Sequence, residues 1–405
     1  MRDFAQDFPA LSKPVYGRRL IYMDNAATTQ IPVPVIERLK SHYENDHGNV
    51  FRGSHYLSRK STEAMEQARR HAARFLNAAT PENIVFTSGA TESINMAAWG
   101  LRAAIAPGDE IIVSALEHHS NFVPWQQLCF EKKAAFKVIP LKDGRFDMAA
   151  FEAMLNPRVR FVAVTEVSNL TGEALPVSAI IKKAHEYGSL VCVDGAQGVR
   201  HSFRIPEDCD FYCISAHKMF GPGGVGILYG KQECLNMLKP VKTGGGMVLS
   251  VDCENTEFAP LPYRLEAGTP DFPAIIAFDE TLDYIESVGI PTILEQEQRL
   301  SASLTKELLG MKGIFVAGGH MDHHGIISFE ADGADAYDLG VMLDLLGVAV
   351  RTGNHCAQPA MKALGKDTIV RASLAFYNTQ EDIDGFLERL ETAICRCQRP
   401  SRKNT

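Results

Sequence analysis

The run LVCVDGAQ, residues 190–197, is the strongest indication of the fold. Its apolar residues lead into a carboxylate, Asp194, and a second run, DFYCISAHK at residues 210–218, also ends in polar residues and Lys218. Near-continuous apolar runs of this length are typical of strands buried on both faces. In an open α/β sheet, ligands bind beyond the carboxyl ends of the strands. The two runs therefore predict an α/β sheet with Asp194 and Lys218 at its ligand-binding edge.

The same pattern extends outward over residues 84–229. Short β-rich runs such as NIVFTSG, EIIVSALE and VRFVAVTEVSN alternate there with helical patterns such as TESINMAAWGLRAAI. This alternation predicts a mostly parallel sheet covered by helices. After about residue 275, a long helical pattern leads to a second set of strands, among them GIISFE and VRASLAF. We expect a large domain over residues 16–280 and a smaller C-terminal α/β domain over residues 281–405, with residues 1–15 packed against the smaller one.

Composition excludes several classes of protein. Hydrophobic residues make up 45% and charged residues 22% of the 405-residue chain, which is enough for a full core. The net charge of −8 argues against nucleic acid as a partner, because phosphate binding needs a basic surface. No run approaches the ~18 apolar residues of a membrane helix, and the first residues lack an apolar signal-peptide core. We expect a soluble, cytoplasmic protein with no membrane partner.

Polar residues follow two of the predicted strands in a way that suggests a bound cofactor. The turn TSGATE, residues 87–92, enters a helix, so its backbone N–H groups and helix dipole favour a phosphate; a simple capped helix start is the alternative. Asp194 ends a strongly apolar strand and needs a partner there. A cationic ring nitrogen would serve, and a helix N-cap is the alternative.

Lys218 directly follows a strand and precedes the glycine-rich turn GPGGVG, residues 221–226. Most lysines are solvated surface charges, but a lysine at a strand end is a candidate for a Schiff base. The glycine turn matches the dinucleotide-binding fingerprint, yet it runs into the strand GVGILY instead of opening a helix. This context argues against a nicotinamide enzyme. A phosphate turn, a strand-end carboxylate and a strand-end lysine together describe a site for pyridoxal 5'-phosphate (PLP).

Ordered motifs occur nearly end to end. They are YMDNAATT (22–29), NVFRGSH (49–55), TSGATE (87–92), EHHSN (117–121), PWQ (124–126), VSN (167–169), DGAQ (194–197), SAHK (215–218), EAGTP (266–270), RTGNHC (351–356) and RASL (371–374). In these motifs the chain resembles the class V aminotransferase-like enzymes of PLP-dependent transferase fold type I, and more closely the group II (SUF-type) cysteine desulfurases. The RTGNHC stretch is the part most specific for that activity.

The resemblance implies a role for each cofactor-binding residue. Lys218 would form the Schiff base with PLP and then move the substrate's α-proton, and Asp194 would pair with the pyridine nitrogen. His118 would stack on the ring, and Gln197 would hydrogen-bond the ring oxygen. The phosphate would be held by Ala90, Thr91, Ser215 and His217, joined by Thr269 from a second subunit.

The resemblance also implies how the substrate is bound and what happens to its sulfur. Arg371 would clamp the carboxylate of L-cysteine, with Asn169 and Arg351 nearby. Cys356 would take the sulfur as a persulfide and release L-alanine, so we expect it to be exposed and partly ionised on a loop that Gly353 allows to move. A homodimer with a shared active site and a sulfur-acceptor protein, with iron–sulfur cluster assembly as the destination, complete the expectation.

Alternatives stay open within and outside this fold. Another class V enzyme, such as a selenocysteine lyase acting on L-selenocysteine, a kynureninase-like lyase or an aminotransferase, would use the same cofactor but does not always need the thiol of Cys356. A non-catalytic sulfur-transfer scaffold would not need Lys218, Asp194 or Arg371.

Two groups of histidines resemble metal ligands, but we expect no metal. His118 and His119 are adjacent, and neighbours on a strand point to opposite faces. The cluster at residues 320–324, HMDHH, lies in a turn before a strand. Among the cysteines other than Cys356, the context suggests that all are inert or terminal. The chain departs from the family where DFPA follows EAGTP, and in a shorter segment over residues 244–263.

Overall fold

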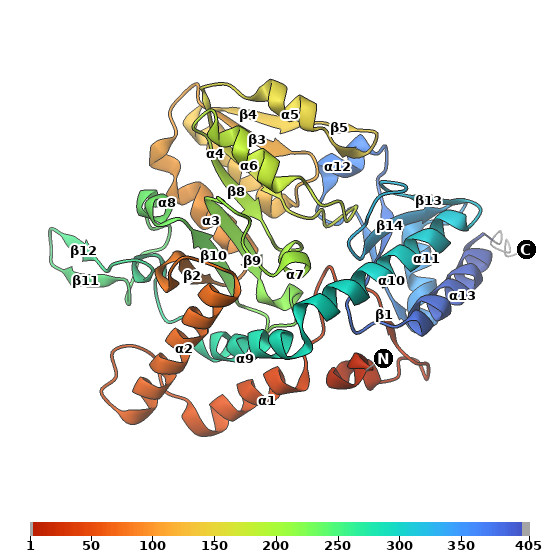
Figure 1. Ribbon diagram of the computed structural model, residues 1–405, viewed down its shortest axis with the longest axis horizontal. Helices are drawn as coiled ribbons and strands as arrows, with labels where there is room; N and C mark the ends of the chain where they lie inside the picture. Colours follow the sequence, from red (N-terminus) through yellow and green to blue (C-terminus); the bar gives the residue numbers. More distant parts are fainter. Residues whose placement is uncertain (1–2, 399–405) are drawn as a thin grey trace, which may run out of the picture.

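A seven-stranded sheet forms the centre of the computed structural model, which describes residues 3–398 (Figure 1). In spatial order the strands are β2 (Ile84–Thr87), β10 (Gly226–Gly230), β9 (Phe211–Ser215), β8 (Leu190–Asp194), β7 (Val159–Thr165), β3 (Glu110–Ser114) and β4 (Ala135–Ile139). β10 is antiparallel to both of its neighbours, and the other adjacent pairs are parallel. The prediction of a mostly parallel α/β sheet is therefore confirmed, and the run at residues 190–194 is its fourth strand.

Helices cover both faces of this sheet because alternate residues of each strand point to opposite sides. In β8, Val191 and Val193 pack into one core and Cys192 into the other. The helices packed in the first core include α2 (Tyr56–Phe75), α5 (Met148–Met154), α6 (Val177–His185), α7 (Val199–Ser202) and α9 (Phe272–Val288). Those in the second are α3 (Ala90–Gly100), α4 (Val123–Lys132) and α8 (Gln232–Met237).

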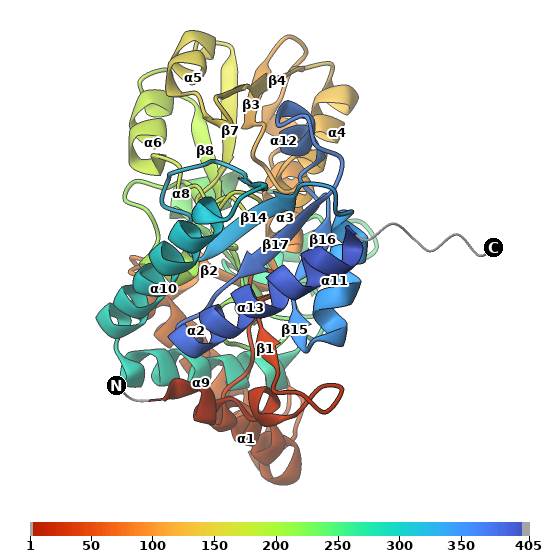
Figure 2. The ribbon, with the colours of Figure 1, turned by 90° about the vertical axis from the view of Figure 1, so that its right-hand side faces the viewer.

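A second, antiparallel sheet lies in the C-terminal part of the chain (Figure 2). Its strands, in order, are β13 (Ile314–Val316), β14 (Ile326–Ala331), β17 (Ile369–Ser373) and β16 (Arg351–Gly353). The helices of its core are α10 (Ile290–Gly310), α11 (Ala336–Leu345) and α13 (Gln380–Cys397). α12 (Gln358–Ala363) follows β16, and the N-terminal strand β1 (Ile21–Tyr22) pairs with β15 (Val348–Ala349).

The long helical pattern after residue 275 is two helices, with a break at Gly289. This glycine has φ of +91°, a conformation that L side chains rarely adopt, and Pro291 stands in the first turn of the next helix. The glycine ends α9 and the proline helps to begin α10, so the chain turns from the large sheet toward the small one.

The N-terminal residues touch both parts of the molecule. The ring of Phe8 lies 4.5 Å from that of Tyr377 and 6.2 Å from that of Phe220, centroid to centroid. Phe8 is fully buried in the core that also holds Phe376 and Tyr284. Residues 375–377 follow β17 of the small sheet, whereas Phe220 lies in the loop that follows β9 of the large sheet. The expected packing of residues 1–15 against the smaller domain stays a prediction. The domain boundary at 280/281 stays a prediction.

Three small elements lie outside these layers. α1 (Val33–Ser41) precedes α2, and β5 (Leu141–Lys142) pairs with β6 (Arg145–Phe146). The hairpin of β11 (Val248–Val251) and β12 (Thr256–Phe258) projects from the body at the left of Figure 1. Cys253 is exposed in the hairpin turn, so the expectation that it is inert does not follow from burial. Within residues 3–398, no helix combines the length and apolar character needed to cross a membrane.

Candidate active site

A cavity of about 330 Å³ lies at the carboxyl ends of β8 and β9, beside the start of α3. Every predicted site residue except Thr269 lines it. The lining residues are Ala26, Ala27, Ala90, Thr91, His118, Ser120, Asn169, Asp194, Ala196, Gln197, Ser215, His217, Lys218, Arg351, His355, Cys356 and Arg371. Residues more than 300 positions apart in the sequence therefore meet at the edge where the apolar strands end.

Asp194 is the last residue of β8 and is 4% exposed. Its Oδ1 accepts a hydrogen bond from the backbone N of Ala196, 2.9 Å away. Burial raises the pKa of Asp194, and the positive charge of Lys218 opposes this shift. A buried carboxylate with so few protein donors is suited to a cationic partner within the cavity.

Lys218 follows β9 in a short 3₁₀ turn, Ala216–Lys218. Its Nζ makes no hydrogen bond to any residue that the structure describes. Burial lowers the pKa of Lys218; Asp194 opposes the shift, and the charge of Arg371 adds to it. A lowered pKa increases the neutral fraction of the amine, which is the nucleophilic form.

An anion cradle stands at the start of α3. Gly89 has φ of +154°, and a Cβ there would lie 3.2 Å from Ser215 Oγ, so glycine suits the turn. The backbone N of Ala90 donates to Ser215 Oγ at 2.8 Å, and Thr91 Oγ1 lies 2.7 Å from Ser120 Oγ. These donors and the helix N-terminus together favour a bound phosphate.

His217 lies at the edge of this cradle, with Nδ1 3.2 Å from Thr28 Oγ1. Burial, with the charge of Lys218, lowers the pKa of His217 to about 4. The imidazole is therefore neutral near pH 7 and would contribute a hydrogen bond rather than a full charge.

The two adjacent histidines do not lie on a strand, contrary to the sequence argument. β3 ends at Ser114, and His119 begins a 3₁₀ turn, His119–Asn121, because Glu117 ties this segment down. The buried Glu117 carboxyl accepts from Asn121 Nδ2 at 2.6 Å and from the backbone N of Thr165 at 2.9 Å. The turn places the ring of His118 in the cavity.

His118 is a neutral ring in this position. Burial is the main cause that lowers its pKa to about 3, with the charge of Lys218 adding to the effect. Its Nδ1 accepts from the backbone N of Ser120 at 3.1 Å, which leaves the ring proton on Nε2. A neutral aromatic ring fits the stacking role that the resemblance implies.

His119, to which the sequence argument gave no role, holds the loop of Cys356. Its backbone N donates to the carbonyl of Cys356 at 2.7 Å, and its Nε2 accepts from the backbone N of Gln358 at 3.3 Å. Cys356 is exposed between β16 and α12, with φ of +54°. In the sequence, only the position of His119 beside His118 in the EHHSN motif pointed to a place near the site; the contact with the Cys356 loop could not be predicted.

Two arginines face the cavity from neighbouring strands of the small sheet. Arg371 is 3% exposed, and its Nη1 donates to the carbonyl of Asn169 at 2.8 Å. Its Nε is buried and has no hydrogen-bond partner among residues 3–398. Arg351 is half-exposed and pairs with Asp24, at 2.9 Å between Nη2 and Oδ2. Asp24 belongs to the YMDNAATT motif but was given no role from the sequence.

Gln197 lines the cavity and uses one of its amide hydrogens within the protein, so its expected contact with a ring oxygen stays a prediction. Its Nε2 donates to the carbonyl of Ala26 at 2.6 Å, and its buried Oε1 has no partner in the described part of the chain. One amide hydrogen of Gln197 is thus used within the protein, and the other is left for a ring oxygen. Gln197 nevertheless lines the cavity beside Asp194.

The donor set fits PLP in its charges and in its unpaired groups. The start of α3 offers its N-terminus and the hydroxyl groups of Thr91 and Ser215 for a phosphate, and Asp194 offers a carboxylate for the ring nitrogen. Lys218 offers an amine, and the unpaired Nε of Arg371 offers a donor for a carboxylate. The phosphate and the ring nitrogen of the cofactor and the carboxylate of an amino acid therefore each have a complement on the cavity wall.

Thr269 lies outside this cavity. It lines a separate one with Ser88, Glu92 and Lys242, among others. The departure after EAGTP has a local function, since Asp271 caps α9 and accepts from the backbone N of Ala274 at 3.2 Å. The placement of Thr269 by the cofactor of a second subunit stays a prediction.

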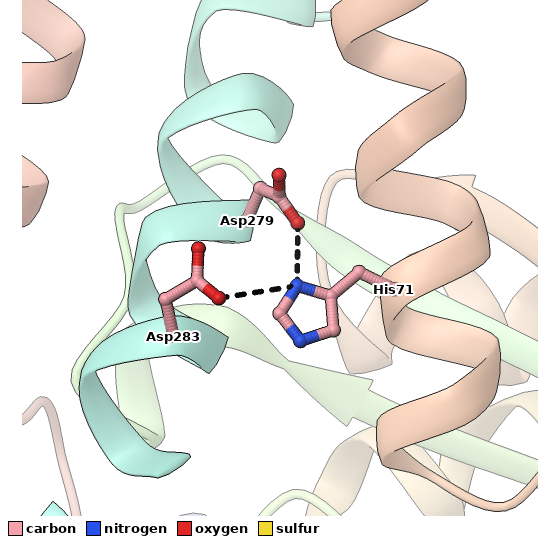
Figure 3. Close-up of side chains that lie close together, drawn as sticks. All are labelled: His71, Asp279 and Asp283. Carbon is pink, nitrogen blue, oxygen red and sulfur yellow. Dashed lines mark hydrogen bonds and ion pairs between the residues drawn. The ribbon is translucent and has the colours of Figure 1, made fainter. Parts of the chain in front are cut away.

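The other histidines of interest hold backbone segments or pair with acids. His323 lies with Nδ1 2.7 Å from the carbonyl of Thr171 and Nε2 2.9 Å from that of Gly319. A separate group joins α2 to α9 and does not line the cavity (Figure 3). It consists of His71, Asp279 and Asp283. His71 Nδ1 is 2.7 Å from Asp279 Oδ1, so this nitrogen already has an acidic partner in the protein.

Comparison with known proteins places this geometry in context. The aminotransferase class-V family matches residues 21–386. A cysteine desulfurase from Cronobacter sakazakii is 42% identical over 405 residues, covering 98% of each chain. The crystal structure of the cysteine desulfurase CsdA (S-sulfonic acid) from Escherichia coli is 35% identical, with a TM-score of 0.89 over 97% of this chain and 98% of that one. The apo cysteine desulfurase from Thermococcus onnurineus is 34% identical, with a TM-score of 0.92 over 98% and 99%.

Proposed function

Because the chain belongs to the aminotransferase class-V family, we propose that it is a PLP-dependent cysteine desulfurase, which converts L-cysteine to L-alanine and keeps the sulfur on Cys356. One observation carries the proposal. The amine of Lys218, the buried carboxylate of Asp194 and the exposed thiol of Cys356 line the same cavity. The amine and the carboxylate serve the cofactor, and the thiol is the feature that a transaminase would not need.

When bound, PLP supplies an electron sink that stabilises negative charge at the substrate's Cα. Asp194 would favour a positive charge on the ring nitrogen, and the neutral ring of His118 would be available to stack on the cofactor. Lys218 would help to hold the cofactor, and its amine would hold and return the substrate's α-proton, a task that suits an amine of lowered pKa.

Arg371 binds and orients the substrate carboxylate through its unpaired Nε. Cys356 then attacks the substrate's sulfur: an S–S bond forms, the Cβ–S bond breaks, and the freed carbon takes up a proton. In sum, L-cysteine and the Cys356 thiol become L-alanine and a Cys356 persulfide, so atoms and electrons balance without an added oxidant or reductant. The exposed position of Cys356 allows a protein thiol to collect the sulfur.

Mass spectrometry of the protein, followed by peptide mapping, tests the proposal. PLP-loaded protein treated with L-cysteine, in the absence of reductant, should gain one sulfur atom on the peptide that contains Cys356 and release a matching amount of L-alanine. Cys356→Ala should keep the yellow colour of bound PLP but retain no sulfur. Lys218→Ala should lose both the colour of the lysine-bound cofactor and alanine release.

A matched control is Cys253→Ala, which removes another exposed cysteine outside the cavity. This variant should be indistinguishable from the unaltered protein. Sulfur added to a cysteine other than Cys356, with alanine release unchanged in Cys356→Ala, would assign the transfer to another residue and contradict the proposal.

The proposal extends to the partners of the enzyme. A homodimer is supported by the position of Thr269 outside the cavity and by the exposed apolar residues Leu249 and Val251 on the projecting hairpin. A sulfur-acceptor protein is supported by the exposure of Cys356. The group II subtype, L-selenocysteine as the alternative substrate, iron–sulfur assembly as the destination and the cytoplasmic location stay predictions.

A further inference from the structure

Arg351 and Arg371 stand directly opposite each other on adjacent antiparallel strands. Their Cα atoms are partners in the register of β16 and β17, so both side chains project from the same face of the small sheet. Two like charges in this arrangement repel each other, and Arg371 is almost fully buried. The pair therefore needs a counter-charge if both guanidinium groups are to stay at the cavity.

Asp24 supplies this counter-charge from a segment more than 300 residues away in the sequence. Arg351 donates Nε to Asp24 Oδ1 at 3.1 Å and Nη2 to Oδ2 at 2.9 Å, a two-pronged contact. Arg371 Nη2 lies 3.6 Å from Asp24 Oδ1. The backbone of Asp24 is held by an isolated bridge to Ser373 at the end of β17, so the carboxylate is fixed between the two arginines.

The three side chains together carry one net positive charge. Arg371 keeps its buried Nε unpaired, whereas Arg351 directs Nε and Nη2 at Asp24. Arg351 and Cys356 line the same cavity, so the arginine shares the site with the thiol that must meet the substrate's side chain. Without Asp24, a free arginine would stand at the side-chain end of the substrate.

We propose that Asp24 is a positioning and specificity-determining residue, which neutralises Arg351 so that the site accepts an amino acid with one carboxylate and rejects one with a second carboxylate in its side chain. The inference rests on the proposed function, since it takes the substrate to be an amino acid bound through Arg371. It explains why two arginines can line a site for a substrate with a single carboxylate. The second arginine, Arg351, is already paired with a carboxylate of the protein, that of Asp24.

Binding of two amino acids that carry no transferable sulfur tests the inference. L-Serine resembles cysteine in size, and L-aspartate adds a side-chain carboxylate. Titration calorimetry on the PLP-loaded protein should show a preference for L-serine. In Asp24→Asn the ratio of the two dissociation constants should shift toward L-aspartate by about tenfold, because Arg351 is released to bind the second carboxylate. Asp24→Glu, which keeps the charge, should restore the original preference.

A matched control comes from a second acid–arginine pair, which does not line the cavity. Asp382 also pairs with a half-exposed arginine, Arg19, at 2.6 Å, but lies outside the cavity. Asp382→Asn should leave the ratio unchanged. Arg351→Gln, which leaves the charge of Asp24 unpaired, should shift the ratio the opposite way and provides a second test if Asp24→Asn folds poorly.

Equal weakening of both ligands in Asp24→Asn would overturn the inference, since a residue that only maintains the structure would act in that way. So would an unchanged ratio in folded Asp24→Asn. The proposed function is tested separately, by alanine release from L-cysteine in the unaltered protein. If that release is absent while the binding ratio shifts as expected, the desulfurase proposal fails and the role of Asp24 stands.

Discussion

Two of this protein's almost fully buried arginines lie in different places. Arg69 belongs to α2, and Arg371 lines the cavity. Arg69 binds Glu266 through two nitrogen atoms, at 2.6 and 2.9 Å, and reaches Glu66 through Nε at 3.1 Å. Arg371 makes one hydrogen bond to a backbone carbonyl and a longer contact to Asp24, and its Nε is unpaired in the described chain.

The pKa values of the two arginines shift in opposite directions. Burial lowers the pKa of Arg69, but the nearby Glu266 carboxylate reverses this and leaves it raised. Burial lowers the pKa of Arg371 to about 10, and Asp24 compensates only in part. A buried charge that the protein pairs completely stabilises the fold, whereas one left incomplete retains capacity for a ligand.

Two histidines, His71 in the core and the half-buried His118 in the cavity, repeat this contrast. The hydrogen bond to Asp279 is the main cause that raises the pKa of His71 between α2 and α9 (Figure 3). Burial without an acidic partner lowers the pKa of His118 in the cavity to about 3. His71 therefore favours its charged form and links two helices, while His118 stays neutral and presents a ring face.

The largest effect on stability is expected for Arg69→Met. This change leaves the Glu266 carboxylate buried without its main partner, which should lower the free energy of unfolding by about 3–5 kcal/mol. Chemical denaturation measures it. The control is Arg102→Met, which breaks an exposed pair with Glu131 and should change the value by less than about 0.5 kcal/mol. Equal losses in the free energy of unfolding for Arg69→Met and Arg102→Met would show that the buried pair does not stabilise the fold more than the exposed one.

Arg371→Met should separate activity from stability. Loss of the charged donor to the substrate should lower kcat/KM for L-cysteine by about 30- to 1000-fold, the equivalent of about 2–4 kcal/mol. The free energy of unfolding should be unchanged or higher, because an incompletely paired buried charge has been removed. Steady-state assays and denaturation of the same preparation test both halves. A large loss of stability would show that Arg371 serves the fold as Arg69 does.

The smallest effect concerns pH. Since the pKa of His71 is raised in the folded protein, its contribution is complete below the unfolded value of about 6.5 and is lost as pH rises through the folded value. His71→Gln should remove about 1–2 kcal/mol of stability at pH 6 and less at pH 9. His118→Gln should behave in the opposite way: as pH falls from about 6.5 toward 4, the stability of the variant should increase relative to that of the unaltered protein. Chemical denaturation at a series of pH values measures the free energy of unfolding of both variants. Parallel pH profiles for the two variants would contradict the opposite environments.

The strands and the chemistry at their ends could be predicted from the sequence because both are local. Apolar runs that stop at Asp194 and before Lys218 specify buried strands, and a parallel sheet brings their carboxyl ends to one edge. The glycine turn before Ala90 is local in the same way. The motif around Cys356 predicted an exposed loop, but not which residue would hold it.

Contacts between distant segments were decided by the tertiary structure alone. The register of β16 against β17 sets Arg351 opposite Arg371, and the bridge to Ser373 brings Asp24 between them. Glu117 turns His118 and His119 off the strand, so that one faces the cavity and the other holds the Cys356 loop. The chain's local pattern thus determines where each strand ends and which chemical groups stand there. Which of these groups are paired, and which keep a free donor, depends on charges hundreds of residues apart that only the packed fold brings within hydrogen-bonding distance.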